Sequence, residues 1–521
     1  MTRTRRASPR ARRHPLFAPA LLGAALAATA LAPALAQEPQ RGGTLTVGLH
    51  QDPLVVDPIR TGSFTERQFN RLVYEPLFDI TPDGDAVPYL AESFELSQDG
   101  LTYTIQLRPG IKFHDGTPLN AEAVVANWER FANPENRCRC LNDMEEFASW
   151  RVIDELTVEA VLVEPNVAFP ALLADGPGNM VSPTAFQADP QAIGTNPVGT
   201  GPFRMVEWIR DDHFSAERFE DYWQEGKPYL DQVVLRGIQN TDTLQAAFQS
   251  GQTDIILQPS DQFVARVQKD DAYKVMSPGG FGYEGVYMNF GAPPFDDPRV
   301  REAVALSLDR ELIAKTLLFG LRTPAYSPFG LGMSYHAPVP EYPTHDPEKA
   351  KALLEDYGQP VSFKLTFNNT PNTQRFAQAM QQMWRAVGME VELEPLDQNR
   401  LVQNVVGKQF EAAIFRWTGR SDPHMNTYRF MHSKYADINP SSNYGRIKIP
   451  ELDALLEQGK VEQDREKRGE IYAEVSRVLA REMAYAFTFY VEDKIVAAER
   501  VHGFQSVPDG LLRFDGLWVE Q

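Results

Sequence analysis

Residues 361–417 alternate between short apolar stretches and amphipathic stretches, and no other feature of the sequence constrains the fold as strongly. Three segments have the pattern of strands: "VSFKLTF", "MEVELEPL" and "FEAAIFRW". The two segments between them, "NTQRFAQAMQQMWRAVG" and "RLVQNVVGKQ", have apolar residues at helical spacing. A β-α-β-α-β order predicts parallel strands joined by right-handed crossovers. We therefore expect an α/β fold for this part of the chain.

This topology predicts where a ligand binds. In open parallel sheets, ligands bind beyond the carboxyl ends of the strands. Phe367 ends the first of the three strands and Trp417 ends the third, so we expect both side chains along that edge. The sequence continues from there as "RWTGRSDP", which places Trp417 between two arginines and close to an aspartate. Strand alternation sends Arg416 to the face opposite Trp417.

The first 36 residues differ from the rest of the chain. Six arginines precede an alanine-rich apolar run, and no acidic residue occurs before Glu38. A basic head, an apolar stretch and small residues at Ala34 and Ala36 predict a secretory signal peptide, cut after Ala36. Prolines within the apolar run argue against the alternative of a membrane anchor. No cysteine lies near the cut, so we expect a periplasmic protein that is not a lipoprotein; the Sec and twin-arginine routes both remain open.

Length and charge limit what the mature chain can be. A chain of 521 residues is too long for one ordinary hydrophobic core, which predicts two lobes or more. The formal net charge is −19, and loss of the six N-terminal arginines changes it to −25. Bulk charge of this sign excludes binding to nucleic acid or anionic lipid. The mature part has no apolar stretch long enough to span a bilayer and no heptad run, so we expect a monomer.

The two cysteines of the chain, Cys138 and Cys140, lie in "NRCRCLND". They are too few for a structural zinc site, since no histidines stand at ligand spacing. An oxidising compartment favours a disulfide, although a two-residue step between the partners is geometrically tight. A local Cys138–Cys140 bridge and a pair of free thiols both remain open.

The sequence contains none of the common catalytic motifs that we considered. The chain has no G-x-S-x-G elbow, no H-E-x-x-H and no S-x-x-K with supporting motifs. His114 and Asp115 in "FHDGTP" are neighbours on a turn, so their side chains point apart, and Asp-Gly is itself a turn dipeptide. We expect neither an enzyme nor a cofactor; a secreted hydrolase is the alternative.

Five segments of the chain together resemble one family, solute-binding protein family 5. They are "AESFELSQDGLTYTIQLRPGIKFHDGTPLNAEAVV", "NPVGTGPFRMVEW", "DYWQEGKPYLDQVVLR", "YMNFGAPPFDDPRVREAVALSLDRELI" and "HDPEKAKALLEDYG". This is the dipeptide-, oligopeptide- and nickel-binding group of receptors for ABC importers. The resemblance implies a two-lobed periplasmic binding protein of type II, the large variety with three subdomains, that closes on a small or oligopeptide-like solute at a hinge. It also implies docking on a membrane permease with its ATPase.

The resemblance further implies how the chain is divided. After the signal peptide, 1–36, we expect lobe I at 37–60, 185–284 and 489–521, a subdomain inserted into it at 61–184, and lobe II at 285–488. We place the crossovers between the lobes near 283–290 and 486–490.

The family gives a meaning to the "RWTGRSDP" loop. Peptide-binding members carry an aspartate three residues after this tryptophan, and it holds the ammonium group of the peptide. Arg420 occupies that position here, and the loop is one residue shorter than in the dipeptide receptor. The arginine that holds the peptide carboxylate in that receptor aligns with Phe367. Both clamps for a short peptide are thus absent, which predicts a non-peptide or anionic ligand.

Two interpretations of Arg420 remain open. In one it contacts an anionic or carbonyl-rich ligand; in the other it pairs with Asp422 or with an acid of the facing lobe and latches closure. The ligand-binding residues that we predict are Trp417, Arg420, Phe367, Asp422 and Tyr490. His424 and His432 are eight residues apart and share no helical face, so we expect no nickel or other metal.

Overall fold

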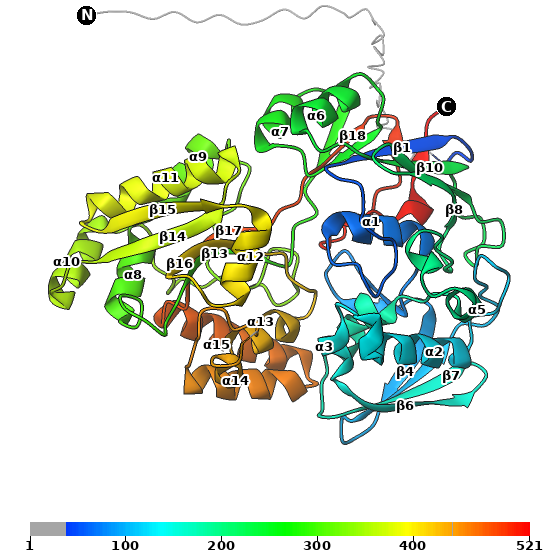
Figure 1. Ribbon diagram of the computed structural model, residues 1–521, viewed down its shortest axis with the longest axis horizontal. Helices are drawn as coiled ribbons and strands as arrows, with labels where there is room; N and C mark the ends of the chain where they lie inside the picture. Colours follow the sequence, from blue (N-terminus) through cyan, green and yellow to red (C-terminus); the bar gives the residue numbers. More distant parts are fainter. Residues whose placement is uncertain (1–37, 440) are drawn as a thin grey trace, which may run out of the picture. The chain divides into compact units, whose positions relative to one another are not determined.

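The computed structural model describes residues 38–521 except residue 440 (Figure 1). The predicted signal peptide, with its cut after Ala36, lies outside the described residues. Within the described part, no helix combines the length and the apolar character that crossing a membrane requires. Residues 39–521 form one compact unit, which contains three sheets of four or more strands.

The first domain is built on a seven-stranded sheet with the order β12-β18-β11-β1-β10-β9-β8. Its strands are β1 (Thr44–Leu49), β8 (Phe203–Ile209), β9 (His213–Arg218), β10 (Gln232–Gly237), β11 (Ile255–Leu257), β12 (Tyr273–Met276) and β18 (Ile495–Ala498). Helix α1 (Phe64–Val73) packs against one face, where alternate residues of β1 such as Val47 are fully buried. Helices α6 (Thr241–Gln249) and α7 (Asp261–Val267) pack against the other face.

The insert is a smaller domain with a four-stranded antiparallel sheet in the order β4-β5-β7-β6. Its elements are the hairpin β2 (Phe78–Ile80) and β3 (Ala86–Pro88), the strands β4 (Ala91–Leu96), β5 (Thr102–Leu107), β6 (Phe147–Asp154) and β7 (Thr157–Leu162), and the helices α2 (Ala121–Ala132), α3 (Leu141–Met144) and α4 (Phe169–Leu172).

The limits of the insert differ from the expected 61–184. Helix α1 buries Phe69 and Leu72 in the core of the first domain, and so does Phe186 of α5 (Pro183–Ala188). The buried residues of the insert from Leu77 to Met180 belong to a different cluster, which Ile59 also joins but no buried residue of α1 does. The expected range is therefore too wide at its start by the whole of α1, because the apolar face of that helix belongs to the seven-stranded sheet.

The second domain contains the five-stranded sheet, in the order β15-β14-β16-β13-β17. Its strands are β13 (Tyr283–Met288), β14 (Ser362–Asn368), β15 (Glu390–Leu396), β16 (Ala412–Trp417) and β17 (Tyr485–Tyr490). Strand β14 is parallel to both β15 and β16, which confirms the β-α-β-α-β prediction. The crossover helices are α11 (Pro371–Ala386), which buries Trp384 against Phe363, and α12 (Gln398–Val406).

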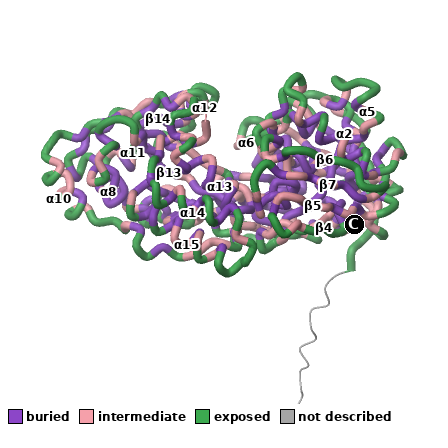
Figure 2. The backbone as a smooth tube through the Cα atoms, turned by 90° about the horizontal axis from the view of Figure 1, so that it is seen from below, coloured by how far each residue is buried: buried purple, intermediate pink, exposed green. Residues whose placement is uncertain are grey.

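Further helices surround this sheet (Figures 1 and 2). They are α8 (Pro298–Leu306), α9 (Arg310–Leu317), α10 (Pro347–Tyr357), α13 (Pro423–Met431), α14 (Pro450–Val461) and α15 (Arg465–Arg481). Figure 2 shows β13 as a buried element and α10 as a largely exposed one. Near the C-terminus, β19 (Val501–His502) pairs with β20 (Trp518–Val519), and both strands pack in the core of the first domain.

Two segments connect the domains, and they are shifted from the expected crossovers near 283–290 and 486–490. Strands β13 and β17 lie wholly in the second sheet, so the connections are residues 277–282 and 491–494. The two segments run side by side: Val491 N donates to the Gly282 carbonyl oxygen at 3.0 Å. A Cβ on Gly280 would lie 2.0 Å from the Val491 oxygen, so glycine is required at this approach.

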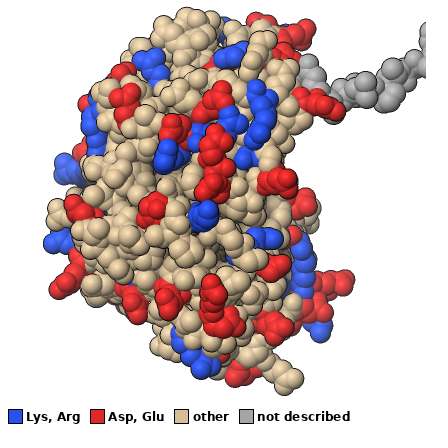
Figure 3. All heavy atoms as spheres, turned by 90° about the vertical axis from the view of Figure 1, so that its right-hand side faces the viewer, with Lys and Arg blue, Asp and Glu red and all other residues tan. Residues whose placement is uncertain are grey.

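A buried ionic cluster joins the C-terminal segment to the insert. Arg513 binds both Asp79 and Asp509 at 2.9 Å, and Arg71 binds Asp79 at 2.5 Å. Burial alone would raise the pKa of the Asp79 carboxyl, but Arg513 and Arg71 outweigh it and hold the pKa below its ordinary value. Surface charges are arranged differently: Figure 3 shows acidic and basic side chains intermixed over one face.

Removing the central cation of this cluster should destabilise the protein. Arg513→Met leaves two buried carboxylates with Arg71 alone, and we expect a loss of about 3–5 kcal/mol in the free energy of unfolding at pH 7. Because the folded pKa of Asp79 is depressed, its stabilising contribution exists above the unfolded pKa and is lost as the pH falls through the folded pKa. The difference between variant and wild type should therefore begin to shrink once the pH falls below about 4, the ordinary pKa of an unfolded aspartate.

Urea unfolding at pH 7 and pH 3 measures both effects. The matched control is Arg204→Met, which breaks an exposed ion pair with Glu217 and should cost no more than about 1 kcal/mol. Equal losses in the two variants at pH 7 would contradict the importance of the buried cluster.

Candidate ligand-binding site

The loop after β16 is held in place by one buried side chain, Asn426 of α13. Its Oδ1 accepts hydrogen bonds from Trp417 Nε1 at 2.9 Å and from the Arg420 backbone N at 2.7 Å. Its Nδ2 donates to the Arg420 carbonyl oxygen at 2.6 Å. Asn426 is fully buried, so these bonds have no competition from water. The role of this residue was not predicted, because an asparagine four residues after a helix N-cap carries no distinguishing signal in the sequence.

The loop lies directly against the first connecting segment. Gly419 has a φ of +84°, and a Cβ there would be 2.4 Å from the Phe281 carbonyl carbon. Both the left-handed backbone and the close approach require glycine at this position. Residues 418–420 are therefore fixed next to residues 277–282, the segment that joins the two domains.

A polar cavity of about 370 Å³ lies beside this loop. We call it the Arg420 cavity. The loop contributes Thr418 and Arg420, α1 contributes Arg67, and the insert contributes Arg139, Asp143 and Asp175. Three guanidinium groups thus line one small cavity, and they come from three separate parts of the chain.

Asp175 of the insert pairs with two of these arginines. Its Oδ2 lies 3.1 Å from Arg67 Nη2 and 3.8 Å from Arg420 Nε. Burial alone would raise the pKa of Asp175, but the two arginines hold it below its ordinary value. Arg420 keeps 37% of its side-chain surface exposed, and its guanidinium carbon is 5.9 Å from the Trp417 ring centroid. It is thus both loosely paired with an acid of the facing insert and available to a ligand.

The structure does not bring Asp422 to this cavity. Both of its oxygens bind Arg468, each at 2.7 Å, and Oδ1 also accepts the His424 backbone N–H as the N-cap of α13. Asp422 and Arg468 are both buried. The expectation that Asp422 contacts ligand or pairs with Arg420 is therefore corrected: its carboxylate is already fully used by a buried guanidinium and a helix end.

The three aromatic residues predicted at the site lie in three different environments. Phe367 is completely buried in the core of the second domain and lines neither of the two cavities described here, which corrects the prediction that it contacts ligand. Trp417 packs on Phe430 with ring centroids 4.3 Å apart and acts through the loop rather than as cavity wall. Tyr490 lines a second cavity.

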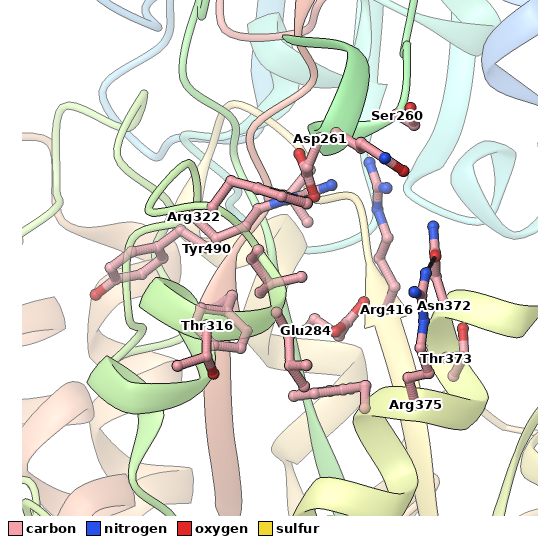
Figure 4. A pocket seen from close by; sticks show the side chains of 17 residues that line it. Ser260, Asp261, Glu284, Thr316, Arg322, Asn372, Thr373, Arg375, Arg416 and Tyr490 are labelled. Atoms are coloured by element: carbon pink, nitrogen blue, oxygen red, sulfur yellow. Dashed lines mark hydrogen bonds and ion pairs between the residues drawn. The ribbon is translucent and has the colours of Figure 1, made fainter. Parts of the chain in front are cut away.

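This second cavity, of about 300 Å³, lies on the other side of the connecting segment at Val491 (Figure 4). We call it the Glu284 cavity. Figure 4 shows Asp261 and Arg322 approaching it from one side and Asn372 with Arg375 from the other. Arg322 pairs with Asp261 at 3.1 Å. Burial raises the pKa of the Glu284 carboxyl.

Arg416 separates the two cavities. It projects to the side of β16 away from Trp417, as strand alternation predicts, and lines the Glu284 cavity. Its Nη2 binds Asp493 at 2.6 Å, and Asp493 lines the Arg420 cavity. This ion pair therefore forms the partition between the cavities.

The histidines and cysteines of the described residues are placed apart from one another or already have partners. In residues 38–521 without residue 440, no group of three or more histidine, cysteine, aspartate or glutamate side chains is arranged to hold a metal ion. Burial lowers the pKa of His424 to about 3, so it is neutral, and His432 lies 3.1 Å from Glu457. Cys138 and Cys140 are joined in a disulfide, and Arg139 stands between them.

Comparison with known proteins agrees with this architecture. The family described as bacterial extracellular solute-binding proteins, family 5, matches residues 85–437. The chain belongs to this family and is a solute-binding receptor of an ABC importer, with the two-lobed fold of type II. The resemblance inferred from sequence is confirmed, and nothing supports the alternative of a hydrolase.

Three known proteins illustrate the relationship. The glutathione-binding protein GsiB of Pectobacterium atrosepticum is 29% identical over 470 residues, which are 88% of this chain and 91% of that protein. The substrate-binding protein CtaP of Listeria monocytogenes is 25% identical with a TM-score of 0.82, covering 92% of this chain and all of that one. The binding protein AgaA of A. tumefaciens R10, solved with agropinic acid, is 25% identical with a TM-score of 0.77, covering 92% and 99%.

Loss of Asn426 should loosen the Trp417 loop. Asn426→Ala leaves the Trp417 and Arg420 groups without their partner, at a cost of about 1–3 kcal/mol in the free energy of unfolding. Asn426→Asp keeps the acceptor but turns a buried carboxylate oxygen toward the Arg420 carbonyl oxygen, so its cost should be at least as large. Urea unfolding measures the difference, with Asn404→Ala on α12 as the control because its side chain makes no hydrogen bond to any described residue. An Asn426→Ala variant as stable as this control would contradict the assignment.

Proposed function

We propose that this receptor captures a small, anionic, peptide-like solute in the Arg420 cavity and delivers it unchanged to the permease. The observation that carries the proposal is the presence of three arginines, Arg67, Arg139 and Arg420, on the wall of one cavity. Arg420 stands where, by resemblance, peptide-binding members place an aspartate. The cavity volume of about 370 Å³ is within the usual range for small-molecule sites.

Charge favours an anion over the amino terminus of a peptide at Arg420. An ammonium group about 4 Å from a guanidinium meets roughly 4 kcal/mol of repulsion at an effective dielectric constant of about 20. A carboxylate at the same place receives two hydrogen bonds from the planar guanidinium. The acidic surface does not cancel this preference, since exposed charges are screened beyond about 8–10 Å.

The relatives supply the first compounds to test. GsiB is named as a glutathione-binding protein, and AgaA was solved with agropinic acid. Glutathione has two carboxylates and one ammonium group, so it meets the charge requirement and is peptide-like. We propose glutathione, or a solute of the same charge pattern, as the ligand.

Ion pairs between the insert and the second domain support capture by closure. Lys460 binds Glu164 at 2.5 Å and Arg465 binds Asp85 at 2.8 Å, in addition to the contact of Arg420 with Asp175. Closure around a solute would form these contacts together and exclude water from the Arg420 cavity. We further propose that the mature protein is a periplasmic monomer without a lipid anchor.

Substitution of Arg420 tests the proposal. We expect Arg420→Ala to weaken binding of glutathione and of S-methylglutathione at least tenfold, and Arg420→Asp to weaken it further, because the ligand carboxylate loses its partner and then meets a like charge. Isothermal titration calorimetry gives the affinities, and mass spectrometry shows whether the released solute is unchanged. Arg400→Ala on α12, an exposed arginine away from both cavities, is the control.

Two outcomes would contradict the proposal. If neither Arg420 variant weakens binding threefold, Arg420 is a latch on Asp175 and no ligand contact. If the wild type tightly binds a dipeptide without charged side chains, and neither glutathione nor agropinic acid, the anionic-solute proposal is wrong.

A further inference from the structure

Two charged side chains of the insert enter the Arg420 cavity from one short segment, "CRCLND". Arg139 lies between the two disulfide-linked cysteines, and Asp143 belongs to the helical turn α3 that follows. Both residues line the cavity. Within the part of the chain that the structure describes, neither side chain has a hydrogen bond or an ion pair.

The other charged residues of this cavity are already paired. Arg67 and Arg420 share Asp175, and Asp493 binds Arg416. Asp509 binds Arg513. Among the described residues, the cavity therefore presents one guanidinium and one carboxylate that have no hydrogen bond or ion pair, both on the insert, although Arg420 and Arg429 attract the carboxylate from a greater distance.

This combination selects against a simple anion. Burial raises the pKa of the Asp143 carboxyl, and the positive charges of Arg420 and Arg429 only partly offset that rise. A ligand that brings carboxylates alone satisfies Arg139 and leaves Asp143 facing a like charge. A ligand that brings an ammonium group beside a carboxylate satisfies both side chains.

We propose that Arg139 and Asp143 together recognise an α-amino-acid head group on the solute, Arg139 binding its carboxylate and Asp143 its ammonium. This rests on the proposed function, since the head group is placed in the Arg420 cavity, where Arg420 takes a second carboxylate. Asp143 supplies, from the facing insert, the acid that the Trp417 loop lacks. The two recognising residues are four apart in sequence, and the two groups that they bind are attached to the same carbon atom.

The chemical class of ligand follows from that geometry. In an ordinary linear peptide the free ammonium and the free carboxylate are at opposite ends, so no single segment meets both. In a γ-glutamyl compound the amino acid is linked through its side chain, and its ammonium and carboxylate remain together. The structure thus favours a γ-glutamyl or similarly side-chain-linked amino acid over an α-linked peptide.

The disulfide has a specific role in this arrangement. It closes a ring around the Arg139 backbone, and the Cys140 N–H also donates to Cys138 Sγ at 3.1 Å. Arg139 is therefore presented to the cavity from a fixed backbone, which lowers the entropy lost when it binds a carboxylate.

Three S-methylated tripeptides test the proposal without any variant. S-Methylglutathione carries both head-group charges; S-methyl glutaryl-cysteinylglycine lacks the ammonium; and S-methyl 4-aminobutyryl-cysteinylglycine lacks the adjacent carboxylate. The blocked thiol prevents exchange with the Cys138–Cys140 disulfide. We expect calorimetry to show at least tenfold tighter binding of S-methylglutathione than of either analogue.

Matched variants then assign each contact. Asp143→Asn should reduce the preference over the glutaryl compound to less than threefold, and Arg139→Gln should do the same for the aminobutyryl compound. The controls Glu135→Gln and Arg137→Gln change exposed residues of the neighbouring turn that line neither cavity, and should leave all three affinities unchanged. Thermal unfolding checks that every protein is folded.

Each other outcome overturns the proposal in a distinguishable way. Equal binding of S-methylglutathione and the glutaryl compound by the wild type, with Arg420→Ala still weakening both, overturns head-group recognition and leaves the anionic-solute proposal intact. Equal losses for all three compounds in Asp143→Asn or Arg139→Gln show a structural role instead. Tight binding of an uncharged dipeptide and of none of the three compounds contradicts both proposals.

Discussion

The antiparallel pairing of β13 with β17 determines how the two domains are joined. These strands lie next to each other in the five-stranded sheet, and each continues directly into a segment that enters the first domain. The two segments are consequently bonded to one another, with Gly280 and Gly282 allowing the backbones to meet. The Trp417 loop packs on this junction through Gly419. A rotation of one domain against the other should therefore change the contacts of the loop that carries Arg420.

The charged side chains around this junction have different roles. Ion pairs such as Asp422 with Arg468 are buried and bidentate, and they fix helices in place. The partition between the cavities is also an ion pair, Arg416 with Asp493. On the wall of the Arg420 cavity, among the described residues, Arg139 and Asp143 have neither a hydrogen bond nor an ion pair. A receptor with a strongly acidic surface thereby keeps a local environment in which both signs of charge are available to a solute.

The sequence predicted the parallel strands because helical and strand periodicities alternate without interruption over residues 361–417. It did not predict that Asp422 is occupied, since its partner Arg468 lies 46 residues later in the chain. Phe367 was misplaced for a related reason: a residue near the end of a parallel strand can face either the ligand edge or the helices. The assignment of α1 failed because an amphipathic helix does not specify which of two neighbouring sheets it covers.

The position of β18 has a consequence for how the chain folds. This strand comes from residues 495–498 and lies between β11 and β12 in the first sheet. Strand β18 pairs with both β11 and β12. Until residues 495–498 have been synthesised, β12 therefore cannot be joined to the rest of the sheet. Because this contact spans more than two hundred residues, its closure is intrinsically slow. The sheet of the first domain thus contains both β1, at residues 44–49, and β18, at residues 495–498, so it cannot be completed before residues 495–498 have been synthesised.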